Sequence, residues 1–370
     1  MPEGEELDVN PVEGVSRWRL AVKAAVLRSA ASLSFTLSNR TAPVPPPPTR
    51  TIWVDSTLSR WKGPKAIRVY VWERNSAGSP DKRKRTALIN FHGGGFLLGS
   101  GTDDARWVAA VQDTFDAVVF SVEYRLAPGY PYPTPVEDCV DSILQLRERA
   151  EEFGIDPDNI ILSGFSAGAT LALSSWVILQ DPSRWRYEMP PSLPAGEALD
   201  SIAGMVLFYP PLDWTISRSE KRERSSKPEE TLPSSMTDLF DACYIHPYIP
   251  HAQRHDPRLS PGLMPAEMMN KLPPLHLCLC EHDMLLAEGL YFADRAKEAG
   301  RVVTSRVVPG QKHAWDKTLP FNAIDASIAV EYEAAIVTMR HWLSGDAPGL
   351  NVKTISQLDD TVETQVDLPV

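Results

Sequence analysis

Short apolar segments alternate with helical patterns along most of the 370-residue chain. Runs rich in Val, Ile, Leu and Phe predict strands at 50–55, 67–73, 86–91, 117–122, 160–163, 203–209, 275–281 and 302–308. Apolar positions at helical spacing predict helices at 134–153, 167–180, 286–300 and 328–343. Strands that alternate with helices imply an α/β fold in which a mostly parallel sheet is covered by helices on both faces.

Two segments interrupt this alternation. The first 50 residues contain a predicted amphipathic helix and a proline-rich linker. Residues 211–272 are rich in Pro, Ser, Met and aromatic side chains and are too long for an ordinary connection. We expect both segments to form a helical cap over the functional site. The predicted organisation is 1–50 as N-terminal cap segment and linker, 51–210 as the first part of the core, 211–272 as cap insertion, 273–345 as the second part of the core and 346–370 as a polar tail.

The helix predicted at about 14–38 has two interpretations. Its most apolar stretch, 29–39, is too short to span a bilayer and follows four Lys and Arg residues between positions 17 and 28. Such a helix can lie on a membrane surface. It can equally pack on its own protein, and we favour this second interpretation.

Composition and charge narrow the class of protein. With 43% hydrophobic and 23% charged residues the chain is typical of a globular domain, and its net charge of −11 argues against sequence-independent binding to nucleic acid. Its four cysteines form no CxxC pair, and Cys278 and Cys280 share one face of a predicted strand as buried apolar residues. The first ten residues lack the apolar stretch of a secretory signal. We expect a cytoplasmic protein with no cofactor and no metal, although histidines gather at 246, 251 and 255.

A GxSxG pentapeptide at 164–168 provides a candidate nucleophile, Ser166. It directly follows a predicted strand and precedes a predicted helix, which is the context of a nucleophile elbow. The sharp turn strains the serine backbone and requires small neighbours two positions away. The N–H of Ala167, at the start of the helix, would then point at a developing oxyanion. The alternative is a tight glycine turn without catalytic function.

A second glycine-rich segment, HGGGFLLG at 92–99, directly follows the strand predicted at 86–91. Consecutive glycines let the main chain approach a ligand and leave N–H groups free to donate, as an oxyanion-hole loop requires. A phosphate-binding loop is the alternative, but no GK[ST] follows and no GxGxxG is paired with a later acidic residue. We expect His92 to brace the loop and not to act as a base.

Taken together, HGGGFxxG at 92–99, YRLAP at 124–128 and GxSAG at 164–168 resemble the hormone-sensitive-lipase family of α/β hydrolases, over roughly residues 86–344. The resemblance implies the α/β-hydrolase fold, with an eight-stranded, mostly parallel sheet and a helical cap. It also implies that the N–H groups of the loop glycines join the residue after the serine in the oxyanion hole, here Gly93, Gly94 and Ala167.

The chain departs from this family at its elbow. The usual motif is GDSAGG, whereas here Phe165 replaces the Asp and Ala169 replaces the last Gly. A Phe at this position, with Trp315 shortly after the candidate histidine, resembles fungal members of the family. We expect Phe96, Phe165 and Trp315 to line the substrate site.

Two further residues complete a predicted Ser-His-Asp triad. Asp283 lies just after the strand predicted at 275–281 and begins the family's D-x-L-x-x-E/D-G pattern, with Glu281 and Glu288 as alternative acids. His313 lies five residues after the last strand. The order Ser, Asp, His along the chain is that of α/β hydrolases.

These residues predict hydrolysis of carboxylic esters of short to medium or specialised acyl groups by two-step acyl transfer, with a small-molecule ester as substrate. The same machinery is compatible with an amidase, a transacylase or a lyase that acts on a biosynthetic intermediate. A non-catalytic ligand-binding protein is a further alternative, because plant hormone receptors resemble this family, but such receptors typically lose the histidine. The family resemblance also allows a homodimer.

Overall fold

A single eight-stranded sheet forms the centre of the computed structural model, which describes residues 15–41, 45–61, 63, 65–74, 84–189, 199–317 and 322–344. Its strands are β1 (Arg50–Asp55), β2 (Ala66–Trp72), β3 (Arg85–Phe91), β4 (Ala117–Glu123), β5 (Ile155–Phe165), β6 (Ile202–Phe208), β7 (Leu275–Cys280) and β8 (Val303–Val308). All eight predicted strands are thus confirmed, and β5 begins five residues earlier than expected.

The strands lie in the order β1-β2-β4-β3-β5-β6-β7-β8. β2 pairs antiparallel with both β1 and β4, and every other neighbouring pair is parallel. The central strands are buried on both faces, which is why their sequences are continuous apolar runs. Leu88 and Val119, for example, enter the core on one face, whereas the next residues, Ile89 and Phe120, enter the core on the other.

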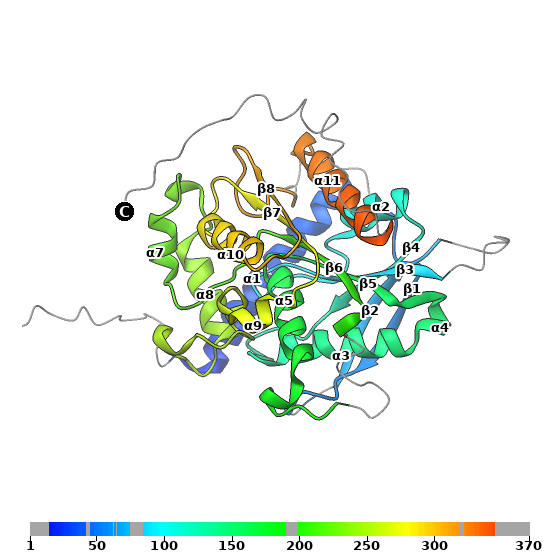
Figure 1. Cartoon of the computed structure of the whole chain (residues 1–370). Helices are drawn as coiled ribbons and strands as arrows, with labels where there is room; N and C mark the ends of the chain where they lie inside the picture. The colour runs from blue at the N-terminus through cyan, green and yellow to red at the C-terminus, as the bar shows by residue number, and fades with distance from the viewer. Residues whose placement is uncertain are drawn as a thin grey trace, which may run out of the picture.

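Helices cover both faces of the sheet (Figure 1). They are α1 (Arg17–Thr41), α2 (Ala105–Thr114), α3 (Thr134–Glu148), α4 (Ala150–Phe153), α5 (Ala167–Gln180), α7 (Arg218–Glu223), α8 (Ser234–Tyr244), α9 (Ala266–Met269), α10 (Leu286–Glu298) and α11 (Ala326–Ser344). Apolar side chains of α3, α5 and α10 pack into the core on one face, and those of α2 and α11 into the core on the other. The predicted α/β fold is confirmed.

The structure differs from the sequence predictions at three places. The helix predicted at 134–153 is interrupted at Arg149, which separates α3 from α4. Helix α2, which begins at Ala105 shortly after the glycine-rich loop, was not predicted. The spacing of Leu286, Leu290 and Ala293 predicts the helix at 286–300, but Leu290 is 37% exposed. The buried face of α10 consists of Gly289, Phe292, Ala293 and Ala296.

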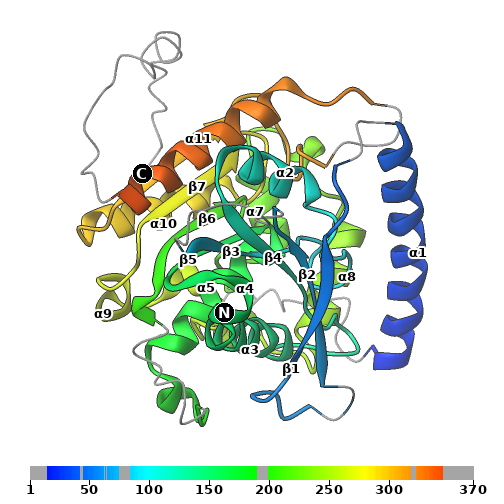
Figure 2. The same ribbon diagram turned by 90° about the vertical axis from the view of Figure 1, so that its right-hand side faces the viewer.

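The chain between β6 and β7 contains α7, α8 and α9, and α8 lies beside α1 from the far N-terminal end of the sequence (Figures 1 and 2). A helix at the N-terminus is therefore confirmed, and one of its faces packs on the protein as expected. The proposed division into two cap segments and two core parts stays a prediction. The tail at 346–370 and residues 42–44 of the linker lie outside the described residues.

Candidate active site

Ser166 occupies a sharp turn between β5 and α5, with a φ of 50° and a ψ of −118°. Two glycines permit this turn. A Cβ atom on Gly164 would lie 2.4 Å from the carbonyl carbon of Gly168, and one on Gly168 would lie 1.9 Å from the carbonyl oxygen of Phe91. Ala167 is the first residue of α5, a position whose N–H has no acceptor within the helix. The turn therefore presents both a hydroxyl and a free amide donor.

The side chains of Ser166, His313 and Asp283 form one continuous hydrogen-bonded chain. Ser166 Oγ lies 2.8 Å from His313 Nε2, and His313 Nδ1 lies 2.6 Å from Asp283 Oδ2. The side chains of His313 and Asp283 are only 6% and 2% exposed. The other carboxylate oxygen of Asp283 accepts the N–H of Leu285 at 3.1 Å, which helps to hold the acid in place. The structure thus brings together the three residues that the sequence singled out.

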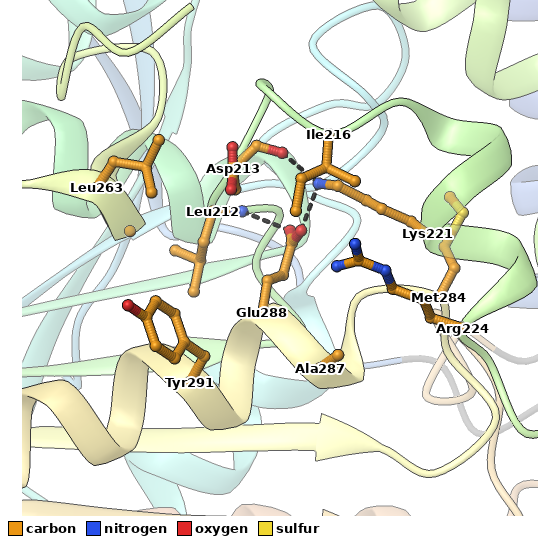
Figure 3. Close-up of a pocket in the computed structure, with 11 residues that line it drawn as sticks. Leu212, Asp213, Ile216, Lys221, Arg224, Leu263, Met284, Ala287, Glu288 and Tyr291 are labelled. Carbon is orange, nitrogen blue, oxygen red and sulfur yellow. Dashed lines mark hydrogen bonds and ion pairs between the residues drawn. The ribbon is translucent and has the colours of Figure 1, made fainter. Parts of the chain in front are cut away.

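The two alternative acids have other partners. Glu281 accepts the N–H of Gly310 at 2.6 Å. Glu288 lines a cavity of about 240 Å³ that does not include Ser166 (Figure 3). There it accepts the N–H of Leu212 at 2.7 Å and pairs with Lys221. Burial raises the pKa of Glu288 and lowers the pKa of Lys221. This pair joins α7 to α10, so Glu288 has a structural partner on the segment between β6 and β7.

The glycine-rich loop lies against the serine. Gly93 and Gly94 line the same cavity as Ser166. Gly94 has a φ of +112°, and a Cβ atom there would lie 2.3 Å from the carbonyl oxygen of Leu98, so the loop needs glycine at this position. Gly93 also lies close to the elbow, since a Cβ atom there would lie 3.0 Å from the carbonyl oxygen of Phe165.

His92 is fully buried behind the loop. Its ring stacks on Tyr124 with centroids 4.3 Å apart, and the Tyr124 hydroxyl donates to the His92 carbonyl at 2.8 Å. His92 Nδ1 lies 2.7 Å from the carbonyl oxygen of Gly93. Burial lowers the pKa of His92, which favours the neutral ring. These contacts fit the expectation that His92 braces the loop.

A cavity of about 530 Å³ opens in front of Ser166. Of the three residues expected to line the substrate site, Phe165 and Trp315 do so. Phe96 is not among the residues that line this cavity. Its ring is buried and stacks on Tyr244 with centroids 3.6 Å apart. The apolar wall comes instead from Leu98, Leu232, Met236 and Phe240.

Sequence reasoning missed a buried charge cluster at the edge of this cavity. Lys317 Nζ lies 2.7 Å from Asp104 Oδ1 and 2.7 Å from Asp316 Oδ2. Although burial opposes it, these two carboxylates raise the pKa of Lys317 to about 12. Tyr209 and Tyr332 donate their hydroxyls to Asp316. No local motif marks these residues, since Lys317 and Asp104 are separated by 213 positions.

Comparison with known proteins places this site in a family context. The family described as alpha/beta hydrolase fold matches residues 88–317. The chain is 30% identical over 238 residues to an arylesterase of Saccharolobus solfataricus, covering 64% of this chain and 71% of that one. It is 29% identical over 254 residues to esterase LipI of Mycobacterium tuberculosis, covering 67% and 69%.

Solved structures of a carboxylesterase and of an alpha/beta hydrolase are also similar to this chain. A thermostable carboxylesterase cloned from a metagenomic library is 26% identical, with a TM-score of 0.65 over 88% of this chain and 98% of that one. An alpha/beta hydrolase from the metagenome of Lake Arreo is 25% identical, with a TM-score of 0.67 over 90% and 92%. The similarity to both structures therefore extends over most of the chain.

Proposed function

The chain belongs to the hormone-sensitive-lipase family of α/β hydrolases and is a carboxylesterase-like serine hydrolase, and on this premise we propose that Ser166, His313 and Asp283 are its catalytic triad. The observation that carries the proposal is the hydrogen-bonded chain from Ser166 Oγ through His313 to Asp283, which opens into a cavity lined by the glycine-rich loop.

In the first half-reaction Ser166 Oγ attacks the ester carbonyl while His313 Nε2 accepts the hydroxyl proton. Asp283 holds the ring so that Nε2 faces the serine and stabilises the imidazolium that forms. The N–H groups of Gly93, Gly94 and Ala167 donate to the oxyanion. His313 then gives the proton to the leaving alcohol, and an acyl-enzyme remains on Ser166.

In the second half-reaction water replaces the alcohol. His313 accepts a proton from the water as its oxygen attacks the acyl carbonyl, and the oxyanion forms again beside the same donors. Collapse of this intermediate releases the carboxylic acid, and the proton returns to Ser166 Oγ. The cycle consumes one ester and one water and needs no other reactant.

We infer a short to medium acyl group from the size and lining of the cavity. Its volume of about 530 Å³ falls within the range of roughly 300–1,000 Å³ in which proteins enclose small ligands. Leu232, Met236 and Phe240 from the proposed cap supply apolar contact, and Met can adapt to several shapes. A small or medium ester matches this volume better than a long-chain triglyceride does.

Hydrolysis of a p-nitrophenyl ester series from acetate to palmitate tests this proposal, with Ser166→Ala as the inactive variant and Ser219→Ala, at an exposed position on α7, as control. We expect the highest kcat/KM at short or medium length and a loss of kcat of roughly a million-fold in Ser166→Ala only. Equal rates on emulsified palmitate would contradict the size inference.

Labelling by a fluorophosphonate probe separates the competing functions. We expect covalent labelling at Ser166 in the wild-type protein and in Ser219→Ala, and none in Ser166→Ala. Labelling without hydrolysis of any ester, but with acyl transfer to an added alcohol or cleavage of a p-nitroanilide, would make the chain a transacylase or an amidase. A folded protein that is neither labelled nor active would contradict catalysis altogether.

A further inference from the structure

Helix α1 has two apolar faces, and only one of them is covered. Its inner face places Leu20 and Ala24 in the core, and the helix packs on α8 (Figure 2). Arg28 links this face to two loops. It donates to the carbonyl of Leu97 in the glycine-rich loop at 2.7 Å and to the carbonyl of Ala127 in the segment 124–128 at 2.5 Å. The helix is therefore held firmly against the catalytic part of the molecule.

The outer face of α1 is apolar as well. Trp18, Val22, Val26 and Leu33 are 65%, 56%, 67% and 61% exposed. Their spacing of four, four and seven residues places them in one stripe along the helix. Four large apolar side chains are thus exposed along one side of α1, and exposed apolar surface gathered in one place on a folded protein marks a binding surface.

Two hydroxyl side chains on this side of the helix form hydrogen bonds to the helix backbone. Ser29 Oγ donates to the carbonyl of Ala25 at 3.0 Å, and Thr36 Oγ1 donates to that of Ser32 at 2.8 Å. Hydroxyls that are bonded back to the backbone cost less to remove from water than free hydroxyls. Ser29 and Thr36 therefore oppose contact with an environment poorer in water less than free hydroxyls would.

The charge of α1 is opposite to that of the chain. The net charge of the protein is −11, yet the sequence of this helix contains no acidic residue. Arg19 and Lys23 are exposed beside the apolar stripe, and Arg17 and Arg28 add positive charge toward the inner face. An exposed apolar stripe flanked by cations is the pattern of a helix that lies in the interface of a membrane.

We propose that the outer face of α1 docks the protein onto an anionic lipid surface. The apolar stripe would enter the headgroup boundary, with Trp18 at the interface, while Arg19 and Lys23 contact lipid phosphates. None of the described helices is both long and apolar enough to cross a bilayer. In the proposed contact α1 lies in the plane of the interface. This inference revises our preference for α1 as a purely internal packing helix and does not depend on the proposed catalytic residues.

Other occupants match the surface less well. A second copy of the same face would bring Arg19 and Lys23 close to their own counterparts, with no acidic residue on the helix to pair with them. The acidic residues 1–14 match the cations in charge but contain few large apolar side chains to cover the stripe. Anionic lipid supplies both the charge and the apolar environment.

Docking through α1 would also bring the cap toward the lipid. Helix α8 packs on α1 and contributes Met236 and Phe240 to the wall of the catalytic cavity. A lipid-bound α1 therefore holds the side of the site that is lined by apolar residues close to the membrane.

Vesicle flotation of the full-length protein tests the proposal, with vesicles of phosphatidylcholine alone and with about one-third phosphatidylglycerol. The test variant is Val22→Glu/Val26→Glu, and the control is Val330→Glu, at an exposed valine of helix α11. Thermal denaturation and gel filtration of each variant establish that it is folded and report its oligomeric state.

We expect the wild-type protein and Val330→Glu to float with anionic vesicles, and the partition coefficient of Val22→Glu/Val26→Glu to fall about tenfold or more. Raising NaCl from about 0.1 M to 0.5 M should weaken binding, because the cations contribute to it. Failure of the wild-type protein to bind anionic vesicles, or equal binding by the double variant, overturns the proposal. So does a wild-type dimer that the double variant converts to a monomer, since α1 would then be a subunit contact.

Discussion

The Nζ atom of Lys317 lies 3.7 Å from the centroid of the Phe165 ring, and Phe165 is the residue immediately before Ser166. The same ring also stacks on Phe208, with centroids 4.3 Å apart. Phe165 occupies the position of the Asp in the usual family motif. Because Asp104 and Asp316 already neutralise Lys317, an aromatic ring at position 165 adds a contact to the cation without adding a third carboxylate.

This cluster predicts a large loss of stability in Lys317→Met. The substitution leaves Asp104 and Asp316 buried without their cation, and breaking a buried ion pair in this way costs about 3–5 kcal/mol. Denaturant unfolding measures the effect. Lys312→Met is the control, because Lys312 is exposed and also lines the cavity in front of Ser166. It should change the free energy of unfolding by less than about 0.5 kcal/mol. If Lys317→Met lowered the free energy of unfolding by no more than Lys312→Met does, the charge cluster would contribute little to stability.

A second prediction concerns the identity of the catalytic acid. Asp283→Asn keeps the shape of the side chain but removes the charge that orients His313, and we expect kcat to fall by about 10³–10⁴. Glu281→Gln, at the alternative acid two residues away, should stay within about twofold, since Glu281 contacts Gly310 and not His313. A larger loss in Glu281→Gln than in Asp283→Asn would transfer the role to Glu281. Steady-state kinetics on the best p-nitrophenyl ester measures both.

Gly95 and Phe240 should prove to be coupled. Gly95 has a φ of +60°, and a Cβ atom there would lie 2.3 Å from Phe240 Cδ2. Gly95→Ala therefore combines backbone strain of about 1–2 kcal/mol with a steric clash. Gly300→Ala, with a φ of +71° and nothing within 4 Å of the added atom, provides the strain alone.

We expect Gly95→Ala to be less stable than Gly300→Ala, and Phe240→Ala to relieve the difference in the double variant. Residues in direct contact show interaction energies of about 0.5–3 kcal/mol in such cycles. Additive effects in Gly95→Ala/Phe240→Ala would mean that the loop and α8 do not press on each other in solution. Because Phe240 lines the cavity, Phe240→Ala should also move the preferred acyl length upward.

His276 on β7 predicts a loss of stability in acid. Burial lowers the pKa of His276 to about 3, and its Nδ1 lies 3.2 Å from Thr338 Oγ1. In the unfolded chain the imidazole of His276 binds a proton below about pH 6.5, whereas in the folded chain it stays neutral. The free energy of unfolding therefore falls as the pH decreases from about 6.5 toward 3. At pH 5 this group alone accounts for about 2 kcal/mol.

His276→Asn removes this titration while keeping a polar atom near the position of Nδ1. Its free energy of unfolding should therefore change less between pH 7 and pH 5 than that of the wild-type protein, by about 2 kcal/mol. Parallel pH profiles for the two proteins would show that His276 does not contribute to acid sensitivity. Guanidinium titrations at each pH measure the difference.

Local features of the sequence determined the fold and pointed to the three candidate catalytic residues. Central parallel strands are buried on both faces, so β4 and β7, for example, appeared as nearly continuous apolar runs, whereas the edge strand β1 alternates between buried and exposed residues. The elbow at Ser166 demands glycines at fixed positions, because any side chain on Gly164 or Gly168 would overlap the main chain. Asp283 and His313 were recognisable because each follows a late strand in the expected order.

Only the tertiary structure decided which distant side chains meet. The pairing of Lys317 with Asp104 joins residues 213 positions apart, and a charge carries no local pattern that names its partner. The orientation of Phe96 depends on its stacking with Tyr244, which lies on a helix from another part of the chain. Likewise, periodicity marked α1 as a helix, but the contacts of its inner face decided which apolar residues remained exposed. Burial is a property of the assembled fold, so the sequence alone identified the parts of the site and the tertiary contacts determined their surroundings.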